Sequence, residues 1–328
     1  MLSDVESVWL APRDPLPARF DPNAARSLRS SDLRRPRTPA DTPSMTTAGD
    51  DEALRYYARD GADPLPVVID ALRGAGRDVD QIAIDDLAGI DEFHALGRPA
   101  TMALAELAGI EAGSKVIDIG AGLGGPARFL ADRLRAQVTA VEPTERFRGA
   151  CIELTRRAGL TEQIEVVDGT ATSLPVPDGS MDVAWMQAVA ISVSDKDAMA
   201  REIRRVLRPG GRLAFFDSTS GPRGDPVFPL PWADGPEASF VVPAAELRSA
   251  FEAAGLHPEA WHEQEGALAE IGQRQFEPSV DPSQVGLALL MPDFGTRMAN
   301  IGQSIAGGRL RLLQAVLRAD GADGSVGR

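Results

Sequence analysis

The chain has 328 residues, of which 43% are hydrophobic and 25% are charged. This composition is that of a folded protein, and it excludes collagen-like, disulfide-scaffold and wholly disordered chains. The 34 Lys and Arg residues are outnumbered by 48 Asp and Glu residues, which gives a net charge of −14. We therefore expect no nucleic acid and no membrane surface as a partner, because both are anionic and repel such a charge.

The number of cysteines and the length of the apolar runs indicate the cellular compartment of the protein. Cys151 is the only cysteine, so no internal disulfide bond forms, and no Cys or His cluster has the spacing of a metal site. The best uncharged run, 183–194, is shorter than the roughly 18 residues that span a membrane. The first residues lack the apolar run of a secretory signal. These features predict a cytoplasmic protein without a metal.

Residues 1–44 have the composition of a disordered tail. They hold seven prolines and seven arginines against six acidic residues, with no sustained helix or strand period. One interpretation makes Met45 an alternative translation start and gives the tail no function. The other makes the tail a flexible interaction arm that carries the cluster Arg34, Arg35 and Arg37. Without the tail, residues 45–328 carry a net charge of −15.

Residues 45–110 have helical patterning and no convincing strand. Met102, Leu104 and Leu107 recur at helix spacing near the end of this region. The pattern predicts a helical cap with helices near 51–59, 64–74, 81–88 and 97–109.

Residues 111–328 alternate short apolar runs with amphipathic helices. This alternation predicts a doubly wound α/β domain with a parallel sheet covered on both faces. Strands are expected at 116–119, 138–141, 164–167, 181–186, 212–216 and 256–263, and the ambiguous run 309–317 is interpreted as a strand. Helices are expected at 123–134, 144–158, 195–207 and 243–254. Insertions are expected near 218–240 and 266–305, the second of them mostly helical.

A glycine-rich turn joins the first predicted strand to the following helix. Gly120, Gly122 and Gly125 satisfy G-x-G-x-x-G, and Glu142 lies at the end of the next strand, where a carboxylate accepts both ribose hydroxyls. The motif alone does not separate a dinucleotide from another adenosine cofactor. Asp118 does, because it puts a carboxylate beside the loop where a dinucleotide site favours apolar packing and where a cationic amino-acid group fits.

Five segments in order resemble the class I S-adenosylmethionine-dependent methyltransferases. They are the glycine loop with Asp118, then Glu142, then 169–175 (GTATSLP), 182–185 (DVAW) and 205–213 (RVLRPGGRL). The resemblance covers roughly residues 90–260. It is greatest to the small-molecule branch that includes sarcosine and dimethylglycine N-methyltransferases, through 124–130, 185–187 and 195–196.

The resemblance implies a seven-stranded Rossmann-like sheet and roles for particular residues. Gly120, Ala121 and Gly122 would lie under the methionine part of S-adenosylmethionine, with Asp118 ordering this loop. Glu142 would hold the ribose, and Pro143 and Thr144 would flank the adenine. Thr170 replaces the family's usual aspartate, so the adenine would rely more on Ala171. The backbone of Gln187 would meet the methionine amino group.

Other residues are candidates for the acceptor side. His94 lies in 90–97 (IDEFHALG), a stretch similar to one that closes the cofactor site in related enzymes, and it is the catalytic candidate; a helix-terminal histidine with local hydrogen bonds is the alternative. Tyr57 is a candidate substrate contact, because successive helix positions point about 100° apart and at most one of Tyr56 and Tyr57 readily faces a pocket. Trp232 and Asp217 complete the substrate set, with loop packing and loop capping as their alternatives.

These observations predict a methyltransferase that acts on nitrogen, oxygen or carbon of a small molecule, with S-adenosylhomocysteine as the second product. Two alternatives stay open. The fold is also suited to chemistry without methyl transfer, such as cyclisation, with the cofactor bound. A nicotinamide oxidoreductase uses the same glycine pattern, although Asp118 and the RPGG turn argue against it. The acceptor and the oligomeric state are left open, a homodimer being one option.

Overall fold

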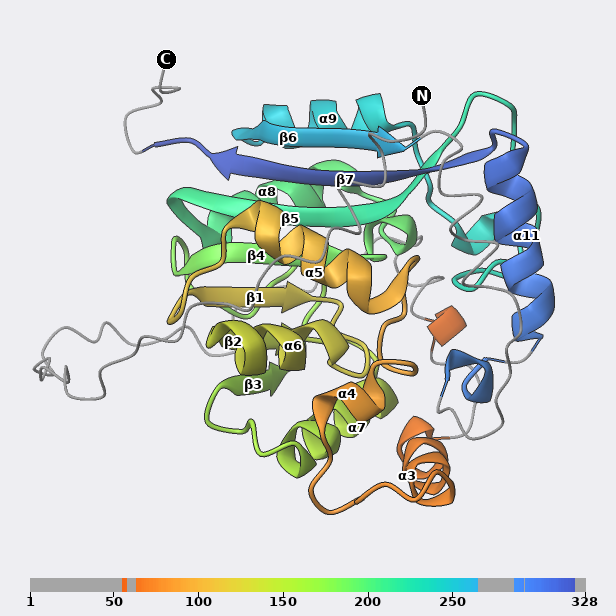
Figure 1. Cartoon of the computed structure of the whole chain (residues 1–328). Coiled ribbons are helices and arrows are strands. Elements are labelled where there is room, and N and C mark those ends of the chain that lie inside the picture. Colours follow the sequence, from red (N-terminus) through yellow and green to blue (C-terminus); the bar gives the residue numbers. More distant parts are fainter. Residues whose placement is uncertain (1–54, 58–62, 265–285, 292, 322–328) are drawn as a thin grey trace, which may run out of the picture. The chain divides into compact units, whose positions relative to one another are not determined.

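The computed structural model describes residues 55–57, 63–264, 286–291 and 293–321, so the predicted tail 1–44 lies outside the described residues. These residues form a seven-stranded sheet in the order β3-β2-β1-β4-β5-β7-β6 (Figure 1). The strands are β1 Lys115–Ile119, β2 Gln137–Val141, β3 Ile164–Val167, β4 Met181–Gln187, β5 Leu207–Ser220, β6 Leu256–Gln264 and β7 Leu310–Ala319. The predicted α/β class is confirmed, as is the strand interpretation of the last apolar run.

Helices cover both faces of the sheet, as the alternating pattern predicts. The helices are α3 Pro64–Gly74, α4 Ile84–Leu87, α5 Gly97–Ala108, α6 Gly125–Leu134, α7 Glu145–Arg157, α8 Lys196–Val206, α9 Ala244–Ala253 and α11 Phe294–Ala306. Helices α5 and α6 pack their apolar residues on one face, and α8 and α9 pack on the other (Figure 1). Within the described residues there are also three short 3-10 helices: η2 Ala190–Ser192, η3 Pro236–Ala238 and η4 Leu287–Leu289.

Some predicted helices differ in extent from those observed. The helix predicted near 81–88 shrinks to the single turn α4. Of the helix predicted near 51–59, only residues 55–57 are described, and these are helical. The predicted helical stretch 266–305 falls partly outside the described residues; within them it contains η4 and α11.

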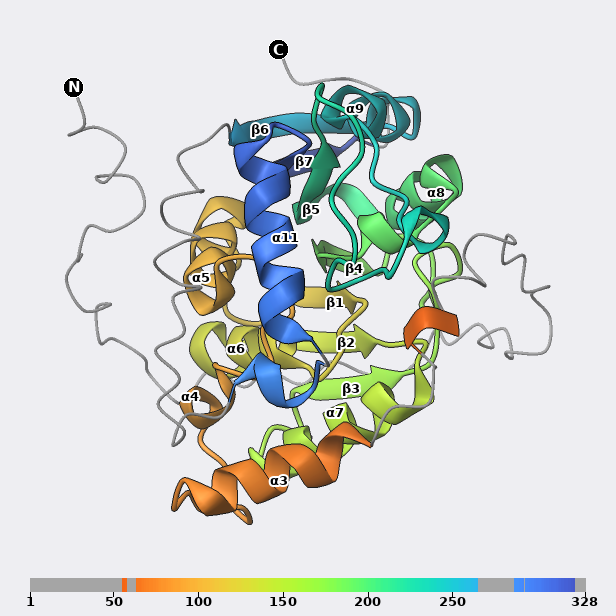
Figure 2. The same ribbon diagram turned by 90° about the vertical axis from the view of Figure 1, so that its right-hand side faces the viewer.

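The prediction of an all-parallel sheet was wrong for one strand. Strands β1 to β5 pair in parallel, but β7 is antiparallel to both β5 and β6. The chain reaches β7 from α11, which lies along the edge where the parallel strands end, so β7 enters the sheet from that edge (Figures 1 and 2). A strand that enters there must run in the opposite direction.

Strand β5 is longer than predicted at both ends. The predicted turn 209–211 lies within it, where the register with β4 jumps from Leu207 to Arg212 and Gly210 adopts a φ of 74°. At the other end, the polar residues 217–220 continue the strand because they pair with 310–313 of β7. Pairing between segments so far apart in the sequence cannot be predicted from the local pattern of these polar residues.

The carboxyl ends of β1, β2, β4 and β5 meet at one edge of the sheet, as expected for parallel strands. Figure 2 views this edge and shows α11 crossing in front of the strand ends, with η4 beside it. Open α/β sheets bind ligands at this edge. In the described part of the chain, every helix is too short or too polar to cross a membrane.

A buried ion pair fastens the segment before α5 to helix α6. Arg128 Nη2 donates to Asp91 Oδ2 over 2.9 Å, and both side chains are fully buried. The close approach depends on Gly125, the first residue of α6, because a Cβ atom there would lie 2.2 Å from the Asp91 carbonyl oxygen. Arg128 thus pairs with an acidic neighbour inside the protein.

We expect Gly125→Ala to lower the free energy of unfolding by several kcal/mol, on the order of an overpacked core position, because the added methyl group meets rigid backbone. Gly149→Ala is the matched control: Gly149 lies within α7 and a Cβ atom there meets nothing within 4 Å. That variant should gain about 0.5–1 kcal/mol from helix propensity. Urea denaturation of both variants checks the prediction, which equal stabilities of the two would contradict.

Candidate active site

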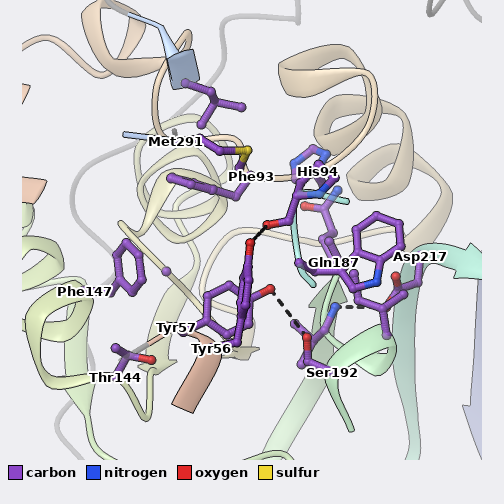
Figure 3. A pocket seen from close by; sticks show the side chains of 18 of the residues that line it. Tyr56, Tyr57, Phe93, His94, Thr144, Phe147, Gln187, Ser192, Asp217 and Met291 are labelled. Carbon is purple, nitrogen blue, oxygen red and sulfur yellow. Dashed lines mark hydrogen bonds between the residues drawn. The ribbon is translucent and has the colours of Figure 1, made fainter. Parts of the chain in front are cut away.

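A cavity of about 830 Å³ opens at the carboxyl edge of the sheet. Its walls come from the ends of β1, β2, β4 and β5, from residues 56–57 and 93–95, and from η4 and α11. Figure 3 shows Thr144 and Phe147 on one side of this cavity and His94, Gln187 and Asp217 on the other. Segments that are far apart in the sequence therefore face one another across a single space.

Glu142 ties the glycine loop to the end of β2. Its Oε2 atom accepts a hydrogen bond from the Gly122 amide and its Oε1 atom accepts one from the Thr144 amide, each at 2.8 Å. The residue is buried, with 6% of its surface exposed, and it lines the cavity. Burial raises the pKa of Glu142, while the two backbone amides oppose that shift. The carboxylate thus sets the distance between the loop and the strand end.

The glycine loop has a backbone that side chains would obstruct. Gly120 and Gly122 have φ angles of 72° and 56°, in the left-handed region that favours glycine. A Cβ atom on Gly120 would lie 2.5 Å from Val189, whereas one on Gly122 would meet nothing within 4 Å. Both glycines line the cavity. Gly120 therefore serves close packing against the end of β4, and Gly122 leaves space for a ligand.

Asp118 and Ala121 are the two predicted cofactor residues that do not line the cavity. Asp118 is 2% exposed, bonds to the Ala127 amide in the first turn of α6, and leaves Oδ2 without a hydrogen-bond partner. Burial, aided by the charges of Glu92 and Glu142, raises its pKa to about 7. The carboxylate faces the helix start behind the loop, so its position supports a loop-ordering role and not direct contact with a cationic ligand group.

The adenine-side candidates lie together on the cavity wall. Pro143, Thr144, Thr170 and Ala171 all line it, at the ends of β2 and β3. Thr170 Oγ1 lies 3.2 Å from Thr172 Oγ1, so the residue that replaces the usual aspartate bonds within its own turn. The grouping agrees with the prediction, and the adenine contacts themselves stay a prediction.

Gln187 lines the cavity, and its side-chain amide is anchored below the cavity surface. Its Oε1 atom accepts from Trp185 Nε1 at 2.9 Å and lies 3.2 Å from Thr101 Oγ1. Because an indole N–H only donates, the contact with Trp185 fixes the orientation of the amide. Its Nε2 atom is buried and has no hydrogen-bond partner.

His94 borders the cavity but is bound on both sides by protein oxygen atoms. Its Nε2 atom lies 2.7 Å from Glu92 Oε2 and its Nδ1 atom lies 3.1 Å from the Ala95 carbonyl oxygen. Glu92 is also bound by Thr101 and Arg98. Although burial opposes ionisation of Glu92, its hydrogen bond and charge interaction with His94 and the charge of Arg98 lower its pKa. These contacts match the local hydrogen-bonding alternative for His94.

Asp217 braces the end of β4 from β5. Its Oδ2 atom accepts from the amides of Val189 and Ala190 at 2.9 and 2.7 Å, and its Oδ1 atom accepts from the Ser218 amide at 2.7 Å. Burial raises its pKa to about 6, against the effect of these hydrogen bonds. Asp217 lines the cavity, but its carboxylate oxygens are occupied by backbone amides. Two of these amides follow β4, and Ser218 belongs to β5, so Asp217 does not cap a following loop as the alternative expected.

Both tyrosines line the cavity, so the expectation that only one would face it was wrong. Their rings pack edge to face with centroids 5.2 Å apart, and the cavity is wide enough to meet both. Tyr56 Oη donates to the Pro231 carbonyl, and Tyr57 Oη lies 3.5 Å from Ser192 Oγ (Figure 3). Trp232 also lines the cavity and donates from Nε1 to Ser239 Oγ at 3.0 Å.

The sequence prediction missed an apolar wall that η4, the following turn and α11 contribute. We use this name for Leu287, Leu289, Leu290, Met291, Phe294, Met298 and Ile301, which all line the cavity. The prediction of a helical insertion at 266–305 located the segment but not these residues. Ser192, Phe93, Phe147 and Arg297 were also missed. The spacing of Phe294, Met298 and Ile301 on one helix face was the available signal.

Comparisons with known proteins agree with this geometry. A model of the methyltransferase domain matches residues 117–215. The dimethylglycine N-methyltransferase of Parasynechococcus marenigrum is 30% identical over 218 residues, which are 66% of this chain and 75% of that relative. Methyltransferase GfsG of Streptomyces halstedii is 36% identical over 132 residues, 40% of this chain. The chain spans 48% of GfsG and less than two thirds of two further relatives.

A solved structure shares the fold along most of the chain. Geranyl diphosphate C-methyltransferase from Streptomyces coelicolor superposes with a TM-score of 0.62 at 16% identity, over 84% of this chain and 100% of that one. At this identity the likeness concerns the fold alone.

We expect Asp118→Asn to be more stable than the wild type by at least about 1 kcal/mol near pH 8. The pKa of Asp118 is raised when folded, so wild-type stability is greatest where the carboxyl is protonated in both states and falls as pH rises from about 4 to about 7. The neutral amide avoids this loss. Chemical denaturation at several pH values checks it: the difference should shrink toward about pH 5, and a variant less stable throughout would contradict the account.

Proposed function

Because the chain belongs to the class I S-adenosylmethionine-dependent methyltransferases, we propose that it transfers a methyl group from S-adenosylmethionine to nitrogen, oxygen or carbon of a small molecule. The observation that carries the proposal is the glycine loop held by Glu142 beside a large cavity at the carboxyl edge of the sheet. This combination supplies what an adenosine cofactor needs: close backbone approach, a buried carboxylate and an enclosed space.

Different cavity-lining residues would contact the methionine, ribose and adenine parts of the cofactor. The methionine part would lie over Gly120 and Gly122, and the ribose hydroxyls would meet Glu142. Pro143, Thr144, Thr170 and Ala171 would enclose the adenine. Asp118 and Ala121, which do not line the cavity, would act by shaping the loop.

Two features fit the cofactor chemically. The open space at Gly122 is where a side chain would otherwise stand, and Glu142 keeps lone pairs on each oxygen atom after accepting one amide hydrogen bond. Gln187 lines the cavity, and its backbone would meet the methionine amino group. When bound, S-adenosylmethionine supplies an electrophilic methyl group on a sulfonium.

The chain's part in such a reaction is alignment in a dry cavity. Displacement at a methyl carbon is in line, so the walls must hold the acceptor atom opposite the sulfur. Tyr56, Tyr57 and Trp232 enclose that space together with the apolar wall. A base is needed only for an acceptor that arrives protonated.

His94 is better suited to positioning than to proton transfer. To accept a proton, its ring would have to leave Glu92 or the Ala95 carbonyl oxygen. We infer that His94 links Glu92 to the cavity wall. Likewise, the carboxylate of Asp217 would act by fixing residues 188–190 next to the acceptor.

The predicted organisation and location remain proposals. They comprise the tail 1–44, the cap 45–110 and the catalytic region 111–328 with insertions near 218–240 and 266–305, in a cytoplasmic small-molecule enzyme. The proposed site uses residues of one chain only, so a homodimer would contain one complete site in each copy.

We expect Glu142→Gln to weaken the binding of S-adenosylhomocysteine at least about tenfold. The amide nitrogen would face a backbone N–H in place of an accepting oxygen, so one bond to the loop is lost. Glu145→Gln is the matched control, because Glu145 is exposed and absent from the cavity lining. Calorimetric titration measures both. Equal affinity of the two variants, or no binding to the wild type, would refute the cofactor assignment.

Methyl transfer and cyclisation are separated by the mass of the product. With S-adenosylmethionine that carries a deuterated methyl group, and a library of phenols, alcohols, amines and enols, we expect a product heavier by one labelled methyl group. Mass spectrometry also detects the S-adenosylhomocysteine formed with it. An isomeric product without label, formed only in the presence of cofactor, would favour the non-methylating alternative.

A further inference from the structure

Resting on the proposed function, we propose that the methyl acceptor is an uncharged, largely apolar molecule whose polar groups are hydroxyl or carbonyl oxygen atoms. Much of the cavity wall is apolar, and the charged side chains that line the cavity are already bound by the protein itself.

The apolar wall leaves hydrophobic surface facing the cavity. Leu289 is 50% exposed, and Met291, Phe294 and Met298 are half-buried. Aromatic side chains add to this surface: Phe93 and Phe147 pack edge to face with centroids 6.1 Å apart, and both line the cavity, with Phe93 beside Met291 (Figure 3). An apolar acceptor would remove this surface from water, which is the main favourable term in such binding.

The two arginines of the lining are held by protein oxygen atoms. Arg146 donates from Nε and Nη2 to the Tyr57 carbonyl at 3.1 and 2.7 Å. Arg297 is buried and donates to Tyr56 Oη at 3.0 Å, to the Leu230 carbonyl, and to Asp234 at 2.6 Å. A carboxylate or phosphate on the acceptor would have to displace these contacts. Acceptors with such groups are therefore disfavoured.

The carboxylates of the lining are held in the same way. Glu142 and Asp217 accept backbone amides on both of their oxygen atoms, and Asp234 pairs with Arg297. Glu142 is assigned to the ribose hydroxyls of the cofactor, and Oδ2 of Asp217 already accepts two amides, so an ammonium group on the acceptor finds few open carboxylate lone pairs. Desolvation of an incompletely paired charge is costly, so the cavity favours an acceptor without one.

Neutral polar groups remain for recognition. Tyr57 Oη and Ser192 Oγ lie 3.5 Å apart, the outer limit of a hydrogen bond, and can each turn to a ligand oxygen. Burial raises the pKa of the Tyr57 phenol above its usual range, so it stays a donor. Hydroxyl and carbonyl oxygens match these groups.

The test uses matched neutral and anionic probes on protein saturated with S-adenosylhomocysteine. The pairs are oestradiol with oestradiol 3-sulfate and decanol with decanoate, with dimethylglycine as a small zwitterion; calorimetric titration measures the binding of each. We expect each neutral probe to bind at least about tenfold more tightly than its anionic partner. Binding of the anions or of dimethylglycine as tight as that of the neutral probes, or no binding of either neutral probe, would overturn the proposal.

Two methionine variants assign the effect to the cavity. Met298→Lys places a cation in the apolar wall, and Met102→Lys places one on the outer surface of α5, where Met102 is 54% exposed. We expect Met298→Lys to lose the preference for neutral probes and Met102→Lys to keep it. If both variants keep it, the probes bind elsewhere and the inference fails.

Cofactor affinity keeps this inference separate from the proposed function. Failure of the wild type to bind S-adenosylhomocysteine would defeat the proposed function. Tight binding of S-adenosylhomocysteine without a preference for neutral probes would defeat only the acceptor class.

Discussion

The two hydrogen bonds that Glu142 accepts hold the ligand-facing edge of the sheet in one arrangement. One bond fixes the loop after β1 through the Gly122 amide, and the other fixes the start of α7 through the Thr144 amide. A loop with glycines at positive φ has many alternatives in an unfolded or detached state, so it needs such a restraint. The same carboxylate lines the cavity, which makes one buried charge both the brace of the loop and its principal polar feature.

Around this brace, buried polar groups connect separate elements. Asp91 and Arg128 join the segment before α5 to α6, and the contacts from Glu92 through Thr101 reach Gln187 at the end of β4. Burying charges costs desolvation energy, which is offset only when partners are well placed. These contacts fix the segments on the β1–β4 side of the cavity relative to one another. The opposite side is made of Tyr56, Tyr57 and α11. Arg297 of α11 donates to Tyr56 Oη and to the Leu230 carbonyl, and so connects the helix to both.

The local parts of this design were predictable from sequence. Strands β1 to β4, helix α6 and the position of Glu142 follow from apolar periodicity and the glycine motif. Long-range features were not: the antiparallel β7 depends on the route of the chain through α11, and the polar end of β5 depends on pairing with β7. For the same reason the direction of the Asp118 side chain, the inclusion of Tyr56 and the composition of the apolar wall required the folded arrangement.

We place the cofactor beside Glu142, and the acceptor between the cofactor sulfur and the apolar wall. A crystal structure with bound S-adenosylhomocysteine tests this most directly. The account predicts the ribose hydroxyls within hydrogen-bond distance of Glu142, the methionine part over Gly120 and Gly122, and the sulfur facing the apolar wall. A ribose away from Glu142, or a ligand outside this cavity, would contradict the account.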